Sequence, residues 1–189
     1  MIHSRRAVLL LPFAAAACAD DPAPRQDFSP LRYEFLTKLR LNVGEIVVEP
    51  PPPPGPLDQA NPSPPGPALQ QMARDRLIAG GTLGRAVFMI DDATVRRSSG
   101  GLEGSLAVHL DVLTSEGTRS GFAEARVTRQ STGIGDLRAA LYAITQQMMQ
   151  DMNVEFEFQV RRSLRDWLQE ATVAPPPAVE QQPLGAPRL

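Results

Sequence analysis

Cysteine, histidine and lysine are nearly absent from this chain of 189 residues. It holds one cysteine, Cys18, one lysine, Lys38, and two histidines, His3 and His109. A single thiol excludes an internal disulfide and a cysteine-based metal cluster, so the stability of the fold has to come from a hydrophobic core. The formal net charge of −2 leaves neither the basic patches typical of nucleic-acid binding nor a strongly acidic tail.

Few side chains are available for catalysis. A hydrolase needs a nucleophile, a base and an orienting group, and His109, on the polar side of an alternating segment, is the only imidazole beyond residue 17. Adjacent Asp91 and Asp92 are expected in a turn at a strand end. The sequence from Gly80 to Arg85 offers N–H groups and a cation but lacks the P-loop spacing. We therefore predict that the chain is not an enzyme and binds no metal or cofactor.

The first residues have the features of an export signal. Arg5 and Arg6 are followed by an apolar stretch over residues 7–17, which as a helix reaches only about 17 Å, roughly half of a hydrocarbon core. This length predicts a cleaved leader rather than a membrane span. The segment Ser4–Leu9 is also similar to a twin-arginine signal, so the export route stays open.

The sequence Ala15-Ala16-Ala17-Cys18 resembles the lipobox of bacterial lipoproteins. The resemblance implies that Cys18 becomes the first residue and carries fatty-acid chains, and two or more such chains anchor a protein stably to a membrane. It further implies the periplasmic face of a membrane, with the outer membrane favoured because Ala19 rather than aspartate follows. The alternatives are that Cys18 is a free thiol in an uncleaved N-terminus, or a chance cysteine in an ordinary secretory signal.

Proline divides the chain after the leader. Ten of the 19 prolines lie in residues 50–67, where a run of five predicts a polyproline II segment. This loop is expected to be a stiff surface loop or a docking strip for an aromatic-lined groove. We expect a leader at residues 1–17, a tether at 18–30, one domain at 31–170 and a disordered Pro-rich tail at 171–189.

Hydrophobic alternation predicts the strands of the domain. Leu102–Val112 and residues 118–129 alternate with period two and read as a β-hairpin. The segment Arg85–Arg97 is expected to pair with this hairpin and, because its start is a continuous apolar run, to be covered on both faces there. Leu39–Val48 changes parity at Gly44, which predicts one strand with a bulge.

Apolar residues at helical spacing predict three helices, at residues 68–79, 136–152 and 153–168. Gly80-Gly81 is expected to stop the first, and Asp136 and Asn153 to cap the other two. Residues 154–158 also alternate like a strand, which is the alternative there. The order β-α-β-β-β-α-α predicts an α+β fold, with a mainly antiparallel sheet of about four strands and about three helices on one face.

This element order, together with the lipobox, resembles the small periplasmic α/β lipoproteins that assist ABC-type transport systems. The resemblance spans residues 39–168 and implies a non-enzymatic adaptor that binds an envelope protein. The alternative is a small-ligand or lipid-binding module whose cavity is lined by the aromatic residues Phe88, Phe122, Phe156, Phe158 and Trp167. A deep apolar cavity would favour this module, whereas a closed core with an apolar surface patch would favour the adaptor.

Overall fold

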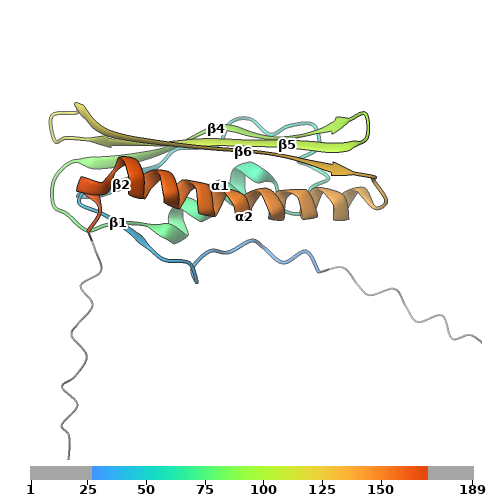
Figure 1. Ribbon diagram of the computed structural model, residues 1–189, viewed down its shortest axis with the longest axis horizontal. Helices are drawn as coiled ribbons and strands as arrows, with labels where there is room; N and C mark the ends of the chain where they lie inside the picture. Colours follow the sequence, from blue (N-terminus) through green and yellow to red (C-terminus); the bar gives the residue numbers. More distant parts are fainter. Residues whose placement is uncertain (1–26, 170–189) are drawn as a thin grey trace, which may run out of the picture.

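The computed structural model describes residues 27–169, and Figure 1 shows a sheet with helices on one of its faces. The elements are β1 (Leu39–Leu41), β2 (Glu45–Val48), α1 (Pro65–Arg76), β3 (Leu77–Ala79), β4 (Arg85–Ser98), β5 (Gly101–Leu113), β6 (Arg119–Thr132), α2 (Leu137–Ser163) and the 3-10 helix η1 (Arg165–Trp167). The fold is α+β, as the sequence predicts. The expected leader, Cys18 and the Pro-rich tail lie outside the described residues. No helix in residues 27–169 is both long and apolar enough to cross a bilayer.

The main sheet has four strands in the order β2-β4-β5-β6. The predicted hairpin is confirmed, because β5 and β6 pair antiparallel, and β4 pairs antiparallel with β5 as expected. The pair β2–β4 is parallel. A second, two-stranded sheet consists of β1 and β3, also parallel. Antiparallel pairing therefore holds for three of the four strands of the main sheet.

The segment Leu39–Val48 was predicted as one bulged strand, and this prediction is wrong. Its two halves, β1 and β2, belong to different sheets. Between them the Gly44 N–H lies 3.1 Å from both the Leu83 and the Gly84 carbonyl oxygens. A Cβ on Gly44 would lie 3.0 Å from the Thr82 carbonyl carbon, so glycine allows the loop after β3 to come this close.

The start of β4 was predicted to be covered on both faces, which is also wrong. Ala86 and Phe88 are buried under the helices, whereas Val87 and Met89 are only half-buried on the outer face of the sheet. The expected turn at Asp91-Asp92 is absent from β4 as well, because the pair lies in the middle of the strand. The register shifts between Ile90 and Asp92, so Asp91 is the extra residue of a β-bulge.

Helix α1 begins and ends about three residues before the predicted bounds of 68–79. Pro65 occupies its first turn, where the missing N–H costs no hydrogen bond. Residues 77–79 leave the helix and pair with β1, so Gly80-Gly81 follows a strand and does not stop a helix. Tertiary pairing has here overridden a helical apolar pattern.

The two predicted C-terminal helices form one continuous helix, α2. The cap at Asp136 is confirmed, since its Oδ1 accepts hydrogen bonds from the Arg138 and Ala139 N–H groups at 2.8 and 3.1 Å. The predicted cap at Asn153 is wrong, because Asn153 lies inside α2 and its Nδ2 donates to the Met149 carbonyl at 2.7 Å. The strand alternative for residues 154–158 is wrong for the same reason.

The hydrophobic core fills the space between the sheet and the two helices. Its centre holds Phe88 of β4 and Phe156 of α2, whose ring centroids are 5.6 Å apart in an edge-to-face arrangement. The predicted inward face of β5 is buried as expected, from Leu102 to Val112. Leu57 and Ala60 of the Pro-rich loop also pack against this core, so the loop is part of the folded domain.

Candidate functional site

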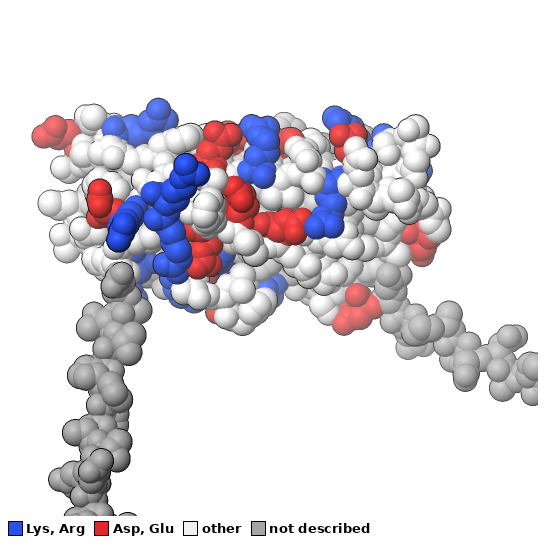
Figure 2. Space-filling view, in the orientation of Figure 1, with Lys and Arg blue, Asp and Glu red and all other residues white. Residues whose placement is uncertain are grey.

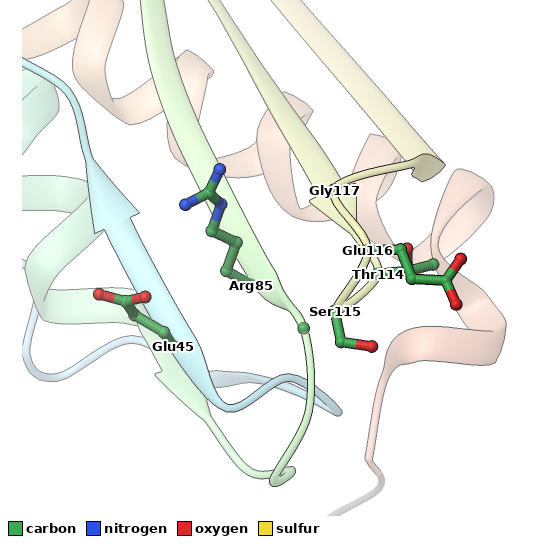
Figure 3. A pocket seen from close by; sticks show the side chains of 7 residues that line it. Glu45, Arg85, Thr114, Ser115, Glu116 and Gly117 are labelled. Atoms are coloured by element: carbon green, nitrogen blue, oxygen red, sulfur yellow. The ribbon is translucent and has the colours of Figure 1, made fainter.

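A cleft lies at the end of the sheet where the loop 80–84 meets the β5–β6 turn at residues 114–118. It consists of two adjoining pockets of about 370 and 340 Å³. Both are lined by Gly84, Thr114 and Ser115, so they form one continuous depression, which we call the end cleft. Figure 3 shows one of the two pockets and the turn beside it.

Two glycines shape the loops that border the end cleft. Gly84 has a φ of +70°, and a Cβ there would lie 2.5 Å from the Leu113 carbonyl oxygen, so only glycine fits. Gly117 has a φ of +83° in the turn, where its N–H donates to the Thr114 carbonyl at 3.0 Å. The close approach at Gly84 brings the two loops together.

One half of the end cleft is polar. Figure 3 shows Glu45 and Arg85 on adjacent strands, and Ser115 and Glu116 on the turn. Glu45 and Arg85 are partners in the register of β2 and β4, but neither takes part in an ion pair within residues 27–169. Both charges are exposed to solvent and are therefore available to a partner.

The other half of the end cleft is apolar. Leu83, Leu113 and Trp167 line it, and Leu83 is 72% exposed at the tip of its loop. The 3-10 helix that carries Trp167 is held in place by the Asn42 N–H, which donates to the Trp167 carbonyl at 2.7 Å. A large apolar side chain in solvent beside an indole ring is a typical feature of a protein contact site.

The glycine-rich sequence at residues 80–85 does not form a phosphate cradle. The Gly80 and Gly81 N–H groups donate to the Leu41 and Val43 carbonyls at 2.7 and 2.9 Å, so neither is available to an anion. The two carboxylates of Glu45 and Glu116 also outnumber the one cation of the same pocket, Arg85, so the pocket does not favour a phosphate. The loop connects β3 to β4, in agreement with its lack of P-loop spacing.

His109 lies on the outer face of the sheet, away from the end cleft. Its Nδ1 is 2.7 Å from the Asp91 Oδ2, and its ring centroid is 5.8 Å from that of Phe122. The bulge in β4 brings Asp91 to this position, which the sequence analysis missed because adjacent strand residues normally face opposite ways. Within residues 27–169 there is no cluster of three or more side chains suited to a metal ion.

The five aromatic residues expected to line one cavity are dispersed. Phe88 and Phe156 are fully buried in the core, whereas Phe122 and Phe158 are exposed on β6 and α2. Trp167 lines the end cleft, and Phe122 lines a separate shallow pocket between β6 and α2. The structure therefore does not bring these five side chains together around a ligand.

No protein-family model and no curated protein sequence matches this chain. Among solved structures it is similar to the crystal structure of protein XCC0632 from Xanthomonas campestris, described as DUF330. The match covers 68% of this chain and 90% of that chain, with 11% sequence identity and a TM-score of 0.41. At these values the likeness carries no argument about function.

Proposed function

We propose that this protein is an acyl-anchored lipoprotein of the periplasmic face of a bacterial membrane, with the outer membrane favoured over the inner. It acts there as a non-enzymatic adaptor of an envelope complex, of the kind that serves ABC-type transport. The observation that carries the proposal is the position of Cys18, the only cysteine, directly after an apolar leader and three alanines. Cys18 itself lies outside the described residues.

The geometry of the domain supports an orientation relative to such an anchor. The described chain begins beside the start of α2, where the Tyr142 hydroxyl donates to the Ser29 carbonyl at 2.8 Å and Phe28 packs edge-on against Tyr142. The nine residues from Ala19 to Asp27 reach at most about 30 Å. Phe28 and Ser29 are thus held against α2.

The end cleft lies at the opposite end of the domain. Helix α2 has 27 residues and is therefore about 40 Å long, and Trp167 follows its C-terminal end. Figure 1 shows that the described chain starts near one end of α2 and ends near the other. A tether at the first end would direct the end cleft away from the membrane, where it could contact a partner in the envelope.

The charges on the side of the domain formed by β6 and α2 favour a protein partner over nucleic acid. Figure 2 shows positive and negative side chains interleaved on this side. Many of them pair with one another, as in Arg129–Asp151 at 2.5 Å and Arg126–Glu124 at 3.3 Å. Such paired charges do not form the continuous basic surface that a phosphate backbone needs.

The anchor is tested by comparing the wild-type protein with Cys18→Ser and the neighbouring control Ala19→Ser in a Gram-negative host. We expect the wild type and the control to stay in the membrane fraction after a salt wash and to incorporate labelled palmitate. Cys18→Ser should appear in the soluble periplasmic fraction without label. An unmodified Cys18 thiol in the wild-type protein, measured by mass spectrometry, would refute the anchor.

The adaptor role is tested by placing a photo-crosslinking amino acid at Leu83 or at Phe35. Both side chains are exposed and apolar, at 72% and 80%, but Phe35 precedes β1 and does not line the end cleft. We expect irradiation of the living cell to link Leu83, and not Phe35, to one envelope protein. Equal products from both positions, or none from Leu83, would show that the end cleft is not the contact site.

A further inference from the structure

Strand β6 is the open edge of the main sheet. Among residues 27–169 it pairs only with β5, and its 14 residues include neither proline nor lysine, which commonly keep a further strand away from an edge. The Gly133 N–H donates to the carbonyl of Gly100, its opposite residue, at 3.0 Å. Because hydrogen-bonded pairs alternate along an antiparallel ladder, the odd-numbered residues from Gly121 to Ser131 bond to β5. The even-numbered residues between them therefore turn their N–H and C=O groups to the open edge.

Helix α2 leaves part of this edge uncovered. It packs below β6 in Figure 1, on the inner face of the sheet, but the shallow pocket between β6 and α2 is a hollow of about 390 Å³ beside the edge. The hollow is lined by Phe122, Glu124 and Arg126 of β6 and by Glu155, Gln159 and Ser163 of α2. Its three β6 residues are even-numbered, so their free backbone groups lie in this uncovered part of the edge.

The charges of β6 suit a second copy of the same strand. Glu124 and Arg126 lie on either side of Ala125, and both side chains are exposed. If two antiparallel copies of β6 are related by a two-fold axis at Ala125, Glu124 of each copy lies opposite Arg126 of the other. Phe122 then lies opposite Thr128, and no like charges meet. An axis at Glu124 or at Arg126 would instead place two like charges opposite each other.

The same register uses the free backbone groups. Its opposed pairs of even-numbered residues, such as Glu124 with Arg126, are the ones whose N–H and C=O groups point to the open edge. Each of these pairs can therefore exchange two hydrogen bonds across the axis. The backbone groups and the charges thus favour the same arrangement of two copies.

We propose that β6 pairs antiparallel with β6 of a second copy across a two-fold axis at Ala125, so that two main sheets become one continuous sheet. Backbone hydrogen bonds provide the affinity, and the Glu124–Arg126 pairs select the register, because exposed ion pairs contribute little affinity by themselves. Pairing changes the orientation that a single anchored copy would take. The two copies run in opposite directions, so with both tethers attached the dimer lies along the membrane and its end clefts open sideways. The pairing itself rests on β6 and does not depend on the acyl anchor.

The test is sedimentation equilibrium of the full chain, purified as its host processes it. A detergent matched in density to the buffer allows the protein mass to be measured whether or not Cys18 is acylated. We expect a reversible dimer. Glu124→Arg and Arg126→Glu each place like charges opposite one another, so each alone should raise the dimer dissociation constant at least about tenfold. An equal mixture of the two variants should recover the dimer, because one copy then carries two positive and the other two negative charges. Glu34→Arg makes the same charge change at an exposed residue outside β6 and should leave the dimer unchanged.

Hydrogen exchange distinguishes edge pairing from a dimer formed through another surface. The N–H groups of Phe122, Glu124 and Arg126 should become protected as the protein concentration rises. Those of Ala123 and Ala125 should be protected at every concentration, because they bond to β5. A wild type that stays monomeric at the highest concentration reached, or a dimer without this alternation, would overturn the proposal. The same holds for single variants that dimerise as tightly as the wild type, or for a mixture that does not recover the dimer.

Discussion

Arg76, the last residue of α1, has a side chain that is only 1% exposed and forms an ion pair with Glu157 of α2. Its guanidinium also donates to the Asn153 carbonyl at 2.8 Å and to the Thr37 carbonyl at 3.2 Å. One side chain thus joins α1, α2 and the segment before β1. These contacts explain how a charged residue is accommodated among the largest buried side chains of the domain.

Replacing Arg76 should destabilise the protein strongly. Arg76→Met removes a buried charge whose partners then lack donors, so we expect the free energy of unfolding to fall by about 3–5 kcal/mol. Arg161→Met is the control, because Arg161 pairs with the same Glu157 from an exposed position and should cost no more than about 1 kcal/mol. Urea denaturation measures both. Equal losses in the two variants would contradict the structural role of Arg76.

Acid should remove part of this stabilisation. Burial raises the pKa of Glu157, but hydrogen bonds from Arg161 and Arg76 outweigh it and hold the pKa below its ordinary value. A carboxyl with a lowered folded-state pKa contributes stability above its unfolded-state pKa, and loses it as the pH falls through the folded-state value. The fall in stability below about pH 5 should therefore be shallower in Glu157→Gln than in the wild type. Identical slopes of stability against pH in the wild type and in Glu157→Gln would show that protonation of Glu157 is not linked to folding.

Replacement of two phenylalanines of α2, two positions apart, should change stability to very different extents. Phe156 is fully buried against Phe88, so Phe156→Ala should cost about 3–5 kcal/mol through the lost packing and the cavity left behind. Phe158 is 54% exposed, and Phe158→Ala should change stability by no more than about 0.5 kcal/mol. Thermal and urea unfolding of both variants checks this. A large effect at Phe158 would indicate that its side chain is covered.

The end cleft offers a test at its two glycines with positive φ. Gly117→Ala adds a methyl group with no atom within 4 Å, so it should cost only the left-handed backbone strain of about 1–2 kcal/mol. Gly84→Ala adds the same strain and a clash with the Leu113 carbonyl oxygen, so it should cost clearly more. The unfolding midpoints of the two variants, each compared with that of the wild type, measure this difference. Similar losses would mean that the two loops can move apart.

Two tyrosine hydroxyls allow a further comparison. The Tyr33 hydroxyl is buried without a partner within residues 27–169, and burial raises its pKa above the ordinary range. Tyr33→Phe removes an unpaired polar atom, so stability should stay unchanged or rise by about 1 kcal/mol. Tyr142→Phe loses the hydrogen bond to Ser29 and should cost about 0.5–1.5 kcal/mol. A destabilised Tyr33→Phe would reveal a partner, such as a water molecule.

Features that depend on neighbouring residues were predicted correctly. The β5–β6 hairpin follows from strict alternation, because one buried face imposes a period of two on each strand. The cap at Asp136 follows from its place before an apolar stripe, since the carboxylate has only to reach N–H groups two and three residues ahead. Both rest on contacts that are local or that repeat regularly along the chain.

Features that depend on distant residues were predicted incorrectly or missed. Asn153 has the composition of a helix cap, but Arg76, 77 residues earlier, donates to its Oδ1 at 3.2 Å within an unbroken helix. The apolar spacing of residues 68–79 predicts a helix, but residues 77–79 pair with β1 and form a strand. The pocket between the Pro-rich loop and α1 likewise needs Asp58 near Ala93 of β4. The spacing of apolar and polar residues along the nearby sequence does not indicate any of these contacts.

The sequence by itself determined the fold class and the main hairpin, because hydrophobic periodicity records which face of an element is buried, and its composition gave the expectation of a leader over residues 1–17. The tertiary structure alone decided where the end cleft lies, how β1 and β2 are divided between two sheets, and that α2 continues through Asn153. Those outcomes depend on which distant segments meet, and that is settled by the packing of the whole core.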